Sequence, residues 1–168
     1  ELGDDALFYL GESHYFAKEY ILAIAEYDRL IRRMPFSPFE EQARYRIAKS
    51  YVILSPKYFR DQTYSDKALG KLQEFIDDYP GSNRISEAEI DIRELRNKMS
   101  YKAYETGILY MKLEEYKSAL ITFMQVTDLY YDTDFINMAH LKIIECHFQK
   151  GEIDEARAHY DLKRKNIE

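Results

Sequence analysis

The sequence contains few residues that interrupt helices. Glycine occurs six times and proline four times in 168 residues, about half of their usual share in globular proteins. Because the turns of strand-rich folds depend on these residues, a fold built mainly from strands is disfavoured. The lone cysteine, Cys146, cannot form an intrachain disulfide and has no matched partners for a zinc site. This composition favours long helices.

Long apolar segments and clustered positive charge are also missing. No apolar run approaches the roughly 18 to 20 residues that a membrane-spanning helix needs, and no charged-then-apolar signal segment is present. The net charge is −6 and 32% of the residues are charged. Duplex nucleic acid rewards clustered Lys and Arg, so nucleic acid is not expected as a partner.

Two segments share the residue spacing of a tetratricopeptide repeat, which is a pair of antiparallel helices. Such helices approach closely only where side chains are small, and large aromatic residues fill the wider gaps on either side. The matching residues are Gly11, Tyr20, Ala23, Tyr27 and Pro35 in one segment, and Gly107, Tyr116, Ala119 and Phe123 in the other. The spacing predicts an all-α fold, a right-handed superhelix of about four tetratricopeptide-like helix pairs.

The predicted pairs form a single tetratricopeptide-repeat domain over residues 1–168. Its units are about 4–35, 37–80, 84–131 and 133–165. The second unit carries an insertion at about 55–65, where the first unit has a short turn, and Pro56 ends the helix that precedes it. The sequence alone leaves open whether this insertion is a tolerated surface loop or a functional feature.

A proline-free stripe of mostly apolar residues runs from Ile85 to Leu113. Its members recur at intervals of three and four, which is the period of one face of a helix. The stripe predicts one helix of about 30 residues, roughly 45 Å long, which closes the second pair and opens the third. Gly107 is predicted to be buried where this helix crosses its partner.

Residue patterns that carry enzyme chemistry are weak. Neighbouring acids such as Glu114 and Glu115 diverge by about 100° on a helix, so we interpret them as solvated charge rather than acid/base pairs. His140 and His147 lie seven positions apart, whereas paired metal ligands usually lie three or four apart. Phosphate loops, a nucleophile elbow and a dinucleotide fingerprint are absent. We expect no catalysis, no metal and no cofactor.

One segment, from Ser55 to Leu120, resembles a known protein family: SPKYFRDQTYSDKALGKLQEFIDDYPGSNRISEAEIDIRELRNKMSYKAYETGILYMKLEEYKSAL. It is similar to the BamD-type outer-membrane assembly lipoproteins, in the form typical of Bacteroidota. The segment PFSPFEEQARYRIAKSY, from Pro35 to Tyr51, also resembles this family's turn between early repeats. The insertion of the second unit belongs to the similar part.

The resemblance implies a non-enzymatic scaffold at the periplasmic face of the outer membrane. Its implied partners are the POTRA domains of the BamA-type barrel insertase, other assembly lipoproteins and unfolded outer-membrane proteins. Full-length family members carry a signal peptide, a lipid-modified N-terminal cysteine and usually five repeats. Cys146 lies inside the fourth predicted repeat, so we expect that this chain lacks the anchor and the first repeat.

The inner face of a tetratricopeptide superhelix is lined by the first helix of each pair, and it is the candidate peptide-binding surface. The residues predicted to lie on it are Phe8, Glu12 and Tyr15 in the first unit, Tyr45, Lys49 and Val52 in the second, and Tyr101, Tyr104 and Ile108 in the third. Aromatic and charged side chains together would suit an extended segment. Two alternatives for the site stay open: the tyrosines pack between helices, or the binding site lies in the N-terminal repeat that this chain is expected to lack. The alternative function is a general peptide-binding adaptor in the cytoplasm.

Overall fold

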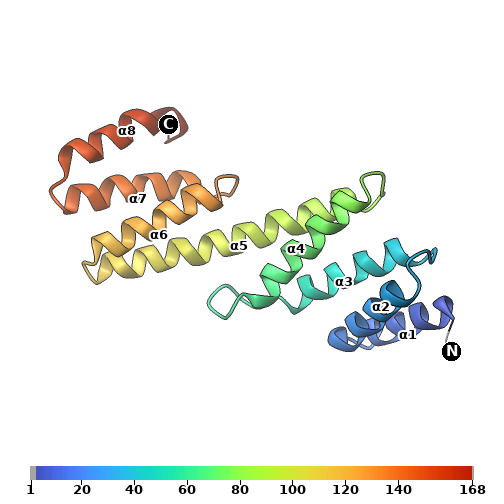
Figure 1. Cartoon of the computed structure of the whole chain (residues 1–168). Helices are drawn as coiled ribbons and strands as arrows, with labels where there is room; N and C mark the ends of the chain where they lie inside the picture. Colours follow the sequence, from blue (N-terminus) through green and yellow to red (C-terminus); the bar gives the residue numbers. More distant parts are fainter. Residues whose placement is uncertain (1–2, 168) are drawn as a thin grey trace. The chain divides into compact units, whose positions relative to one another are not determined.

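The computed structural model describes residues 3–167, with side chains as far as Arg164, and this part of the chain contains helices but no strands (Figure 1). The helices are α1 (Asp4–Phe16), α2 (Tyr20–Arg33), α3 (Glu40–Leu54), α4 (Thr63–Asp78), α5 (Ile85–Lys112), α6 (Tyr116–Leu129), α7 (Ile136–Gln149) and α8 (Ile153–Ile167). The all-α class predicted from the repeat spacing is confirmed. No described helix is long and apolar enough to cross a membrane.

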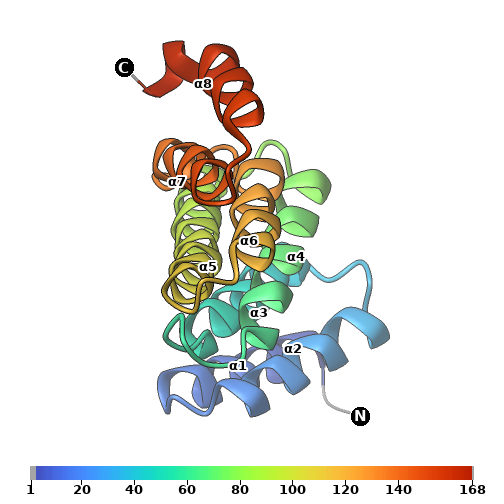
Figure 2. The same cartoon turned by 90° about the vertical axis from the view of Figure 1, so that its left-hand side faces the viewer.

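The chain forms two compact units, residues 1–95 and 96–168, each with its own core. From here on, the first and the second unit mean these two parts of the chain and not the predicted repeat units. In the first unit α2 packs against both α1 and α3, and α4 packs against α3. In the second unit α7 packs against α6 and α8, and Figure 2 shows α6 beside the C-terminal part of α5. The helices therefore follow one another as antiparallel neighbours within each unit.

Helix α5 contributes to both units. It is a single helix of 28 residues, about 42 Å long at 1.5 Å per residue. Its N-terminal part buries Ala88 and Leu95 in the core of the first unit, and its C-terminal part brings Ala103 to the core of the second. The continuous helix predicted from Ile85 to Leu113 is therefore confirmed.

Two glycines mark the closest approach of helices. An added Cβ at Gly11 would lie 2.6 Å from the ring of Tyr27, and one at Gly107 would lie 2.6 Å from the ring of Phe123. Both distances are far below van der Waals contact, so no larger residue fits without displacing the ring. Tyr27 and Phe123 are fully buried. The predicted burial of Gly107 at a helix crossing is confirmed.

Three of the four helix pairs close through the same tight turn. Its central residue has a positive φ at Lys18, Glu114 and Gly151. The backbone N–H of the following residue donates to a carbonyl five residues earlier, as in Glu19 to His14 at 2.9 Å. This geometry satisfies carbonyls at the end of the first helix of each pair.

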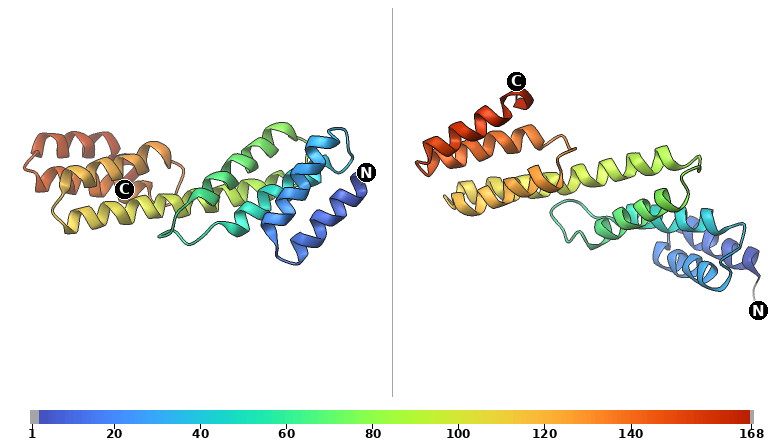
Figure 3. Two further views of the ribbon diagram at one scale, coloured as in Figure 1. Left: turned by 60° about the horizontal axis from the view of Figure 1, so that its bottom comes forward. Right: turned by 45° about the horizontal axis from the view of Figure 1, so that its top comes forward.

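The pair α3–α4 instead closes through an ordered loop from Ser55 to Gln62 (Figure 3). The buried Gln62 side-chain amide donates to the carbonyls of Lys57 at 3.0 Å, Tyr58 at 3.3 Å and Arg60 at 3.0 Å. Its Oε1 accepts a hydrogen bond from Ser65 Oγ at 2.6 Å. A single side chain thus satisfies several carbonyl groups of the loop, which fixes its shape.

Replacing Gly107 with Leu tests the close approach of α5 and α6. The new side chain must displace Phe123, so we expect the free energy of unfolding to fall by about 1 to 3 kcal/mol or more. Chemical denaturation followed by circular dichroism measures the change. Gly70→Ala is the matched control: its added Cβ meets nothing within 4 Å in the middle of α4, so it should stabilise by about 0.5 to 1 kcal/mol. Equal stability of Gly107→Leu and the wild type would contradict the packing.

Candidate binding surface

Two of the residues predicted to line the binding surface, Phe8 and Tyr45, are buried. Phe8 and Tyr45 are 3% and 2% exposed. Phe8 stacks on Phe39 with ring centroids 4.6 Å apart, and Tyr45 packs against Phe75 at 5.3 Å. Both side chains belong to the core in this structure. This burial agrees with the alternative in which the aromatic residues pack between helices. Their role in binding stays a prediction.

Glu12 and Tyr15 join a polar network between α1, α2 and α3. Arg46 donates from Nε and Nη2 to the two carboxylate oxygens of Glu12, at 2.7 and 3.0 Å. The Tyr27 hydroxyl donates to the same carboxylate, and the Arg46 guanidinium lies 4.5 Å from the centroid of the Tyr15 ring. Burial and the adjacent Glu12 raise the pKa of Tyr27, so this hydroxyl remains a donor.

Lys49 links α3 to the N-terminal part of α5. Its Nζ lies 2.7 Å from Asp91 Oδ2 and 3.1 Å from Glu87 Oε1. Val52 is half-buried on the same helix, packed against the core cluster that contains Tyr45. The predicted charged residues of the first unit are therefore engaged in ion pairs between helices, and a ligand would have to exchange with those pairs.

The predicted residues of the second unit are half-buried, the tyrosines next to an aromatic ring and Ile108 next to charged side chains. Tyr101 and Tyr104 pack against Phe135, with ring centroids 5.1 and 5.8 Å apart. Ile108 lines a shallow pocket of about 300 Å³ together with Lys142 and Glu145 of α7. This part of α5 thus shares a surface with α7.

The binding surface predicted from the sequence includes no residue of α7, yet this helix also presents exposed apolar side chains. Met138, Leu141 and Phe148 are exposed by 39%, 47% and 63%. Their spacing of three and seven residues places them on one face of α7. The repeat register contains the signal for this face, because adding 37 residues to Tyr101 and Tyr104 gives Met138 and Leu141.

The two units differ in chemistry at equivalent positions. Glu12, Tyr27 and Arg46 of the first unit correspond to Ile108, Phe123 and Lys142 of the second, since each lies 96 residues earlier. Where the first unit has a carboxylate held by a hydroxyl and a guanidinium, the second has two apolar side chains, and Lys142 pairs instead with Glu145 at 2.7 Å. The candidate residues of the first unit therefore include ion pairs between helices, whereas those of the second are apolar side chains next to the Lys142–Glu145 pair.

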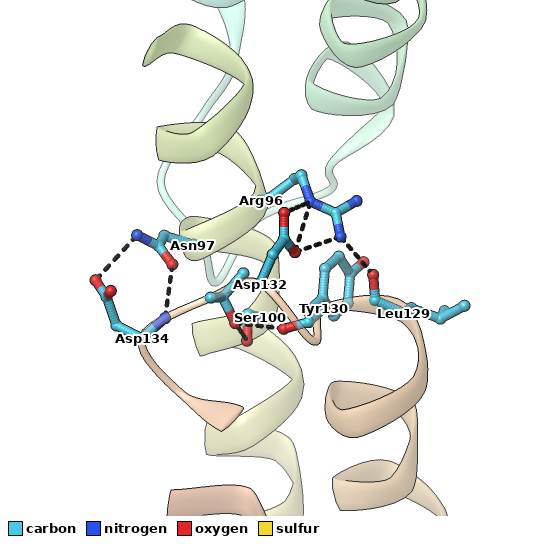
Figure 4. Close-up of polar contacts among 8 residues, drawn as sticks. Arg96, Asn97, Ser100, Leu129, Tyr130, Asp132 and Asp134 are labelled. Carbon is cyan, nitrogen blue, oxygen red and sulfur yellow. Dashed lines mark hydrogen bonds and ion pairs between the residues drawn. The ribbon is translucent and has the colours of Figure 1, made fainter. Parts of the chain in front are cut away.

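The turn between α6 and α7 is fastened to α5 by polar contacts, which hold α7 in place (Figure 4). Arg96 donates from Nε to Asp132 Oδ2 at 2.9 Å and from Nη2 to the Leu129 carbonyl at 2.8 Å. Asn97 Nδ2 donates to Asp134 Oδ2 at 3.0 Å, and the Asp134 N–H donates back to Asn97 Oδ1 at 3.0 Å. Positioning of α7 against α5 thus involves these charged and amide groups as well as apolar packing.

A buried hydroxyl pair completes this attachment. Thr133 Oγ1 lies 2.8 Å from Ser100 Oγ and 2.7 Å from the Tyr130 carbonyl oxygen. The first unit repeats the arrangement: Ser37 Oγ donates to Asp4 at 3.0 Å, and Ser82 Oγ donates to Glu41 at 2.6 Å. Each turn between pairs therefore reaches back to the first helix of the preceding pair.

The described residues include no group suited to bind a metal ion, and their single cysteine is buried. Among them, no group of three or more His, Cys, Asp or Glu side chains is arranged to hold a metal ion. Cys146 is buried, and burial raises the pKa of its thiol to about 11. At neutral pH this thiol is protonated and packs as a small apolar side chain.

The chain matches a known family over nearly its whole length. The model of the family described as YfiO, outer membrane lipoprotein, matches residues 3–162. The chain belongs to this family. The resemblance predicted from residues 55–120 is thereby confirmed.

One curated relative agrees with this assignment. The outer membrane protein assembly factor BamD of Caulobacter vibrioides is 26% identical over 147 residues, which cover 88% of this chain and 48% of that protein. The chain spans about half the length of this curated relative. A solved structure of the MamA protein aligns with 98% of this chain and 95% of its own, at 14% identity and a TM-score of 0.39.

A double-mutant cycle on Arg96 and Asp132 tests the attachment of the α6–α7 turn. We expect Arg96→Gln and Asp132→Asn to couple by about 0.5 to 1 kcal/mol, because the ion pair is bidentate but partly exposed. The hydrogen bonds from Arg96 lower the pKa of Asp132. The stabilisation is therefore present above the unfolded-state pKa of about 3.9 and is lost as the pH falls through the lowered folded-state pKa.

The control cycle uses Lys71 and Glu74, an exposed pair on α4, for which we expect coupling of only about 0.3 kcal/mol. Coupling of the Arg96 pair no larger than that of the control would show that the turn is held by packing alone.

Proposed function

We infer that this chain is part of a non-catalytic scaffold that assembles β-barrel proteins into the outer membrane. The observation that carries this proposal is the family match over residues 3–162, together with a relative named as an assembly factor. The match favours the scaffold over a cytoplasmic adaptor. The proposed location is the periplasmic face of the outer membrane, with a lipid anchor on the full-length protein.

The proposed partners are proteins: the POTRA domains of the BamA-type insertase, other assembly lipoproteins, and unfolded outer-membrane proteins. The charged side chains that the candidate surface offers in the first unit, Glu12 and Lys49, are held in ion pairs that join helices. Such pairs suit a rigid platform rather than a reaction centre, where a nucleophile, a base and an acid converge.

The apolar surface of the second unit is the proposed contact for unfolded segments. Its proposed members are Tyr104 and Ile108 of α5 and the exposed Leu141 and Phe148 of α7, which the repeat register assigns to the same face. A β-barrel strand alternates apolar and polar side chains, so an unfolded strand offers apolar groups that such a surface can cover.

A binding experiment with two matched variants tests this function. The probe is a fluorescently labelled synthetic peptide with the alternating pattern of one outer-membrane β-strand, followed by fluorescence anisotropy. We expect Leu141→Glu to weaken binding about tenfold, because a charge on this face opposes burial of apolar groups. Ile121→Glu is the control: Ile121 is 71% exposed on α6 and lies outside the proposed surface, so its affinity should be unchanged.

Circular dichroism establishes that both variants keep their helicity. An affinity of the folded Leu141→Glu variant equal to that of the wild type would remove the α7 face from the proposal. Failure of the wild type to bind the peptide at all would remove client binding from the function of this chain.

A further inference from the structure

The last helix of the chain meets its neighbour through two histidines. Nδ1 of His140 on α7 lies 3.1 Å from Nε2 of His159 on α8, and the ring centroids are 5.2 Å apart. His140 is 3% exposed and His159 is half-buried. Both rings line a cavity of about 400 Å³ with Met124 and Asp128 of α6 and Lys163 of α8. The pair is therefore a buried polar contact between α7 and α8.

Helix α8 has few other anchors. Of its residues from Ile153 to Arg164, only Ala156 is fully buried, and His159 and Lys163 are half-buried. Ile153, Tyr160 and Leu162 are exposed by 42% or more. Apolar burial therefore contributes less to the docking of α8 than to the docking of α7, which buries Ala139, Ile143 and Cys146. The contact between the two histidines therefore contributes a larger share of the free energy that docks α8.

The contact requires a specific protonation state. An imidazole nitrogen either donates or accepts, so a hydrogen bond between two rings needs one nitrogen with a proton and one without. When both rings are imidazolium, both facing nitrogens carry protons and the two positive charges repel each other. Acid therefore converts the contact from attraction into repulsion.

The surrounding charges favour the neutral state. Besides burial, His159 and Lys163 of α8 lower the pKa of His140, and Asp128 of α6, the acid that faces His140, has the opposite but smaller effect. His147 of α7 also acts on His159, while the Glu152 carboxylate is already paired with His147 and Lys150, at 2.8 and 2.6 Å.

Burial, His159 and Lys163 together lower the pKa of His140 to about 4, and burial with His147 and Lys163 lowers the pKa of His159. An exposed histidine has a pKa of about 6.5. The undocked helix thus takes up protons that the docked helix excludes. Docking is fully stable above about pH 6.5 and weakens as the pH falls from there towards 4.

We propose that the His140–His159 pair is an acid-sensitive latch, which holds α8 on α7 at neutral pH and releases it in mildly acidic solution. Release would leave the rest of the second unit folded, because the core cluster of α5, α6 and α7 includes no residue of α8. It would expose the surface of α7 around His140 and the adjacent cavity.

Hydrogen exchange measured by mass spectrometry on the intact chain tests the latch. The protection factor of peptides within α8, corrected for the intrinsic exchange rate at each pH, reports its opening equilibrium. Between pH 7.5 and pH 5 we expect protection of α8 to fall at least tenfold, since His140 alone would contribute up to about thirtyfold. Peptides of α2 and α3 should change much less.

The double variant His140→Gln/His159→Gln removes both titrating groups but keeps polar side chains. We expect its α8 to lose less than threefold protection over the same pH range. His14→Gln is the control: His14 lies in α1 and pairs with Glu19 at 2.7 Å, so this variant should keep the full wild-type response. A wild-type α8 whose protection is independent of pH, or a double variant with an undiminished response, would overturn the latch.

A direct titration covers the case in which the double variant does not fold. Carbon-13 NMR of the Cε1 atoms in the wild-type chain yields the pKa of each histidine. Values well below 6.5 for His140 and His159 support the latch, and values at or above 6.5 for both overturn it.

Discussion

The architecture depends on two places where a helix backbone lies directly under an aromatic ring. At Gly11 and Gly107 the space that a Cβ would take is filled by Tyr27 and Phe123. Both rings are completely buried, so each glycine fixes how near the two helices of its pair come and how they are registered. Every side chain that the pair presents to its neighbours follows from that register.

The two ring positions differ by one oxygen atom, and that difference extends to the surface. Tyr27 carries its hydroxyl to Glu12, whose carboxylate then holds Arg46 of the next pair. Phe123 has no such group, and Ile108 stands where an acid would be needed. The hydroxyl in the core and the carboxylate above it thus occur together in the first unit and are both missing at the equivalent positions of the second. The repeated backbone geometry is compatible with both.

Much of the fold could be predicted from local sequence signals. The long helix α5 followed from an apolar stripe without proline, and the buried Gly107 followed from its spacing to Ala119. The burial of Phe8 and Tyr45 could not be predicted in this way, because helical periodicity shows which residues share a face but not which neighbouring helix covers that face. The division of the domain into repeat units stays a prediction.

Two other features, the α3–α4 loop and the exposed face of α7, have no sequence motif that predicts them. Gln62 organises its loop through carbonyl groups, which every residue possesses. The fourth pair has Ile144 at the position of Gly107, so its first helix lacks the small residue that marks the others. For this reason the sequence prediction does not include the exposed face of α7, although the repeat register of 37 residues assigns Met138 and Leu141 to it.

The turns that reach back to the preceding pair also shape how the chain can acquire its structure. The contact of Ser37 with Asp4 spans 33 residues, and that of Ser82 with Glu41 spans 41. Contacts of this span join only neighbouring pairs. A pair can therefore become complete when only the next turn has emerged from a ribosome. Assembly can proceed from the N-terminal end without waiting for the rest of the chain.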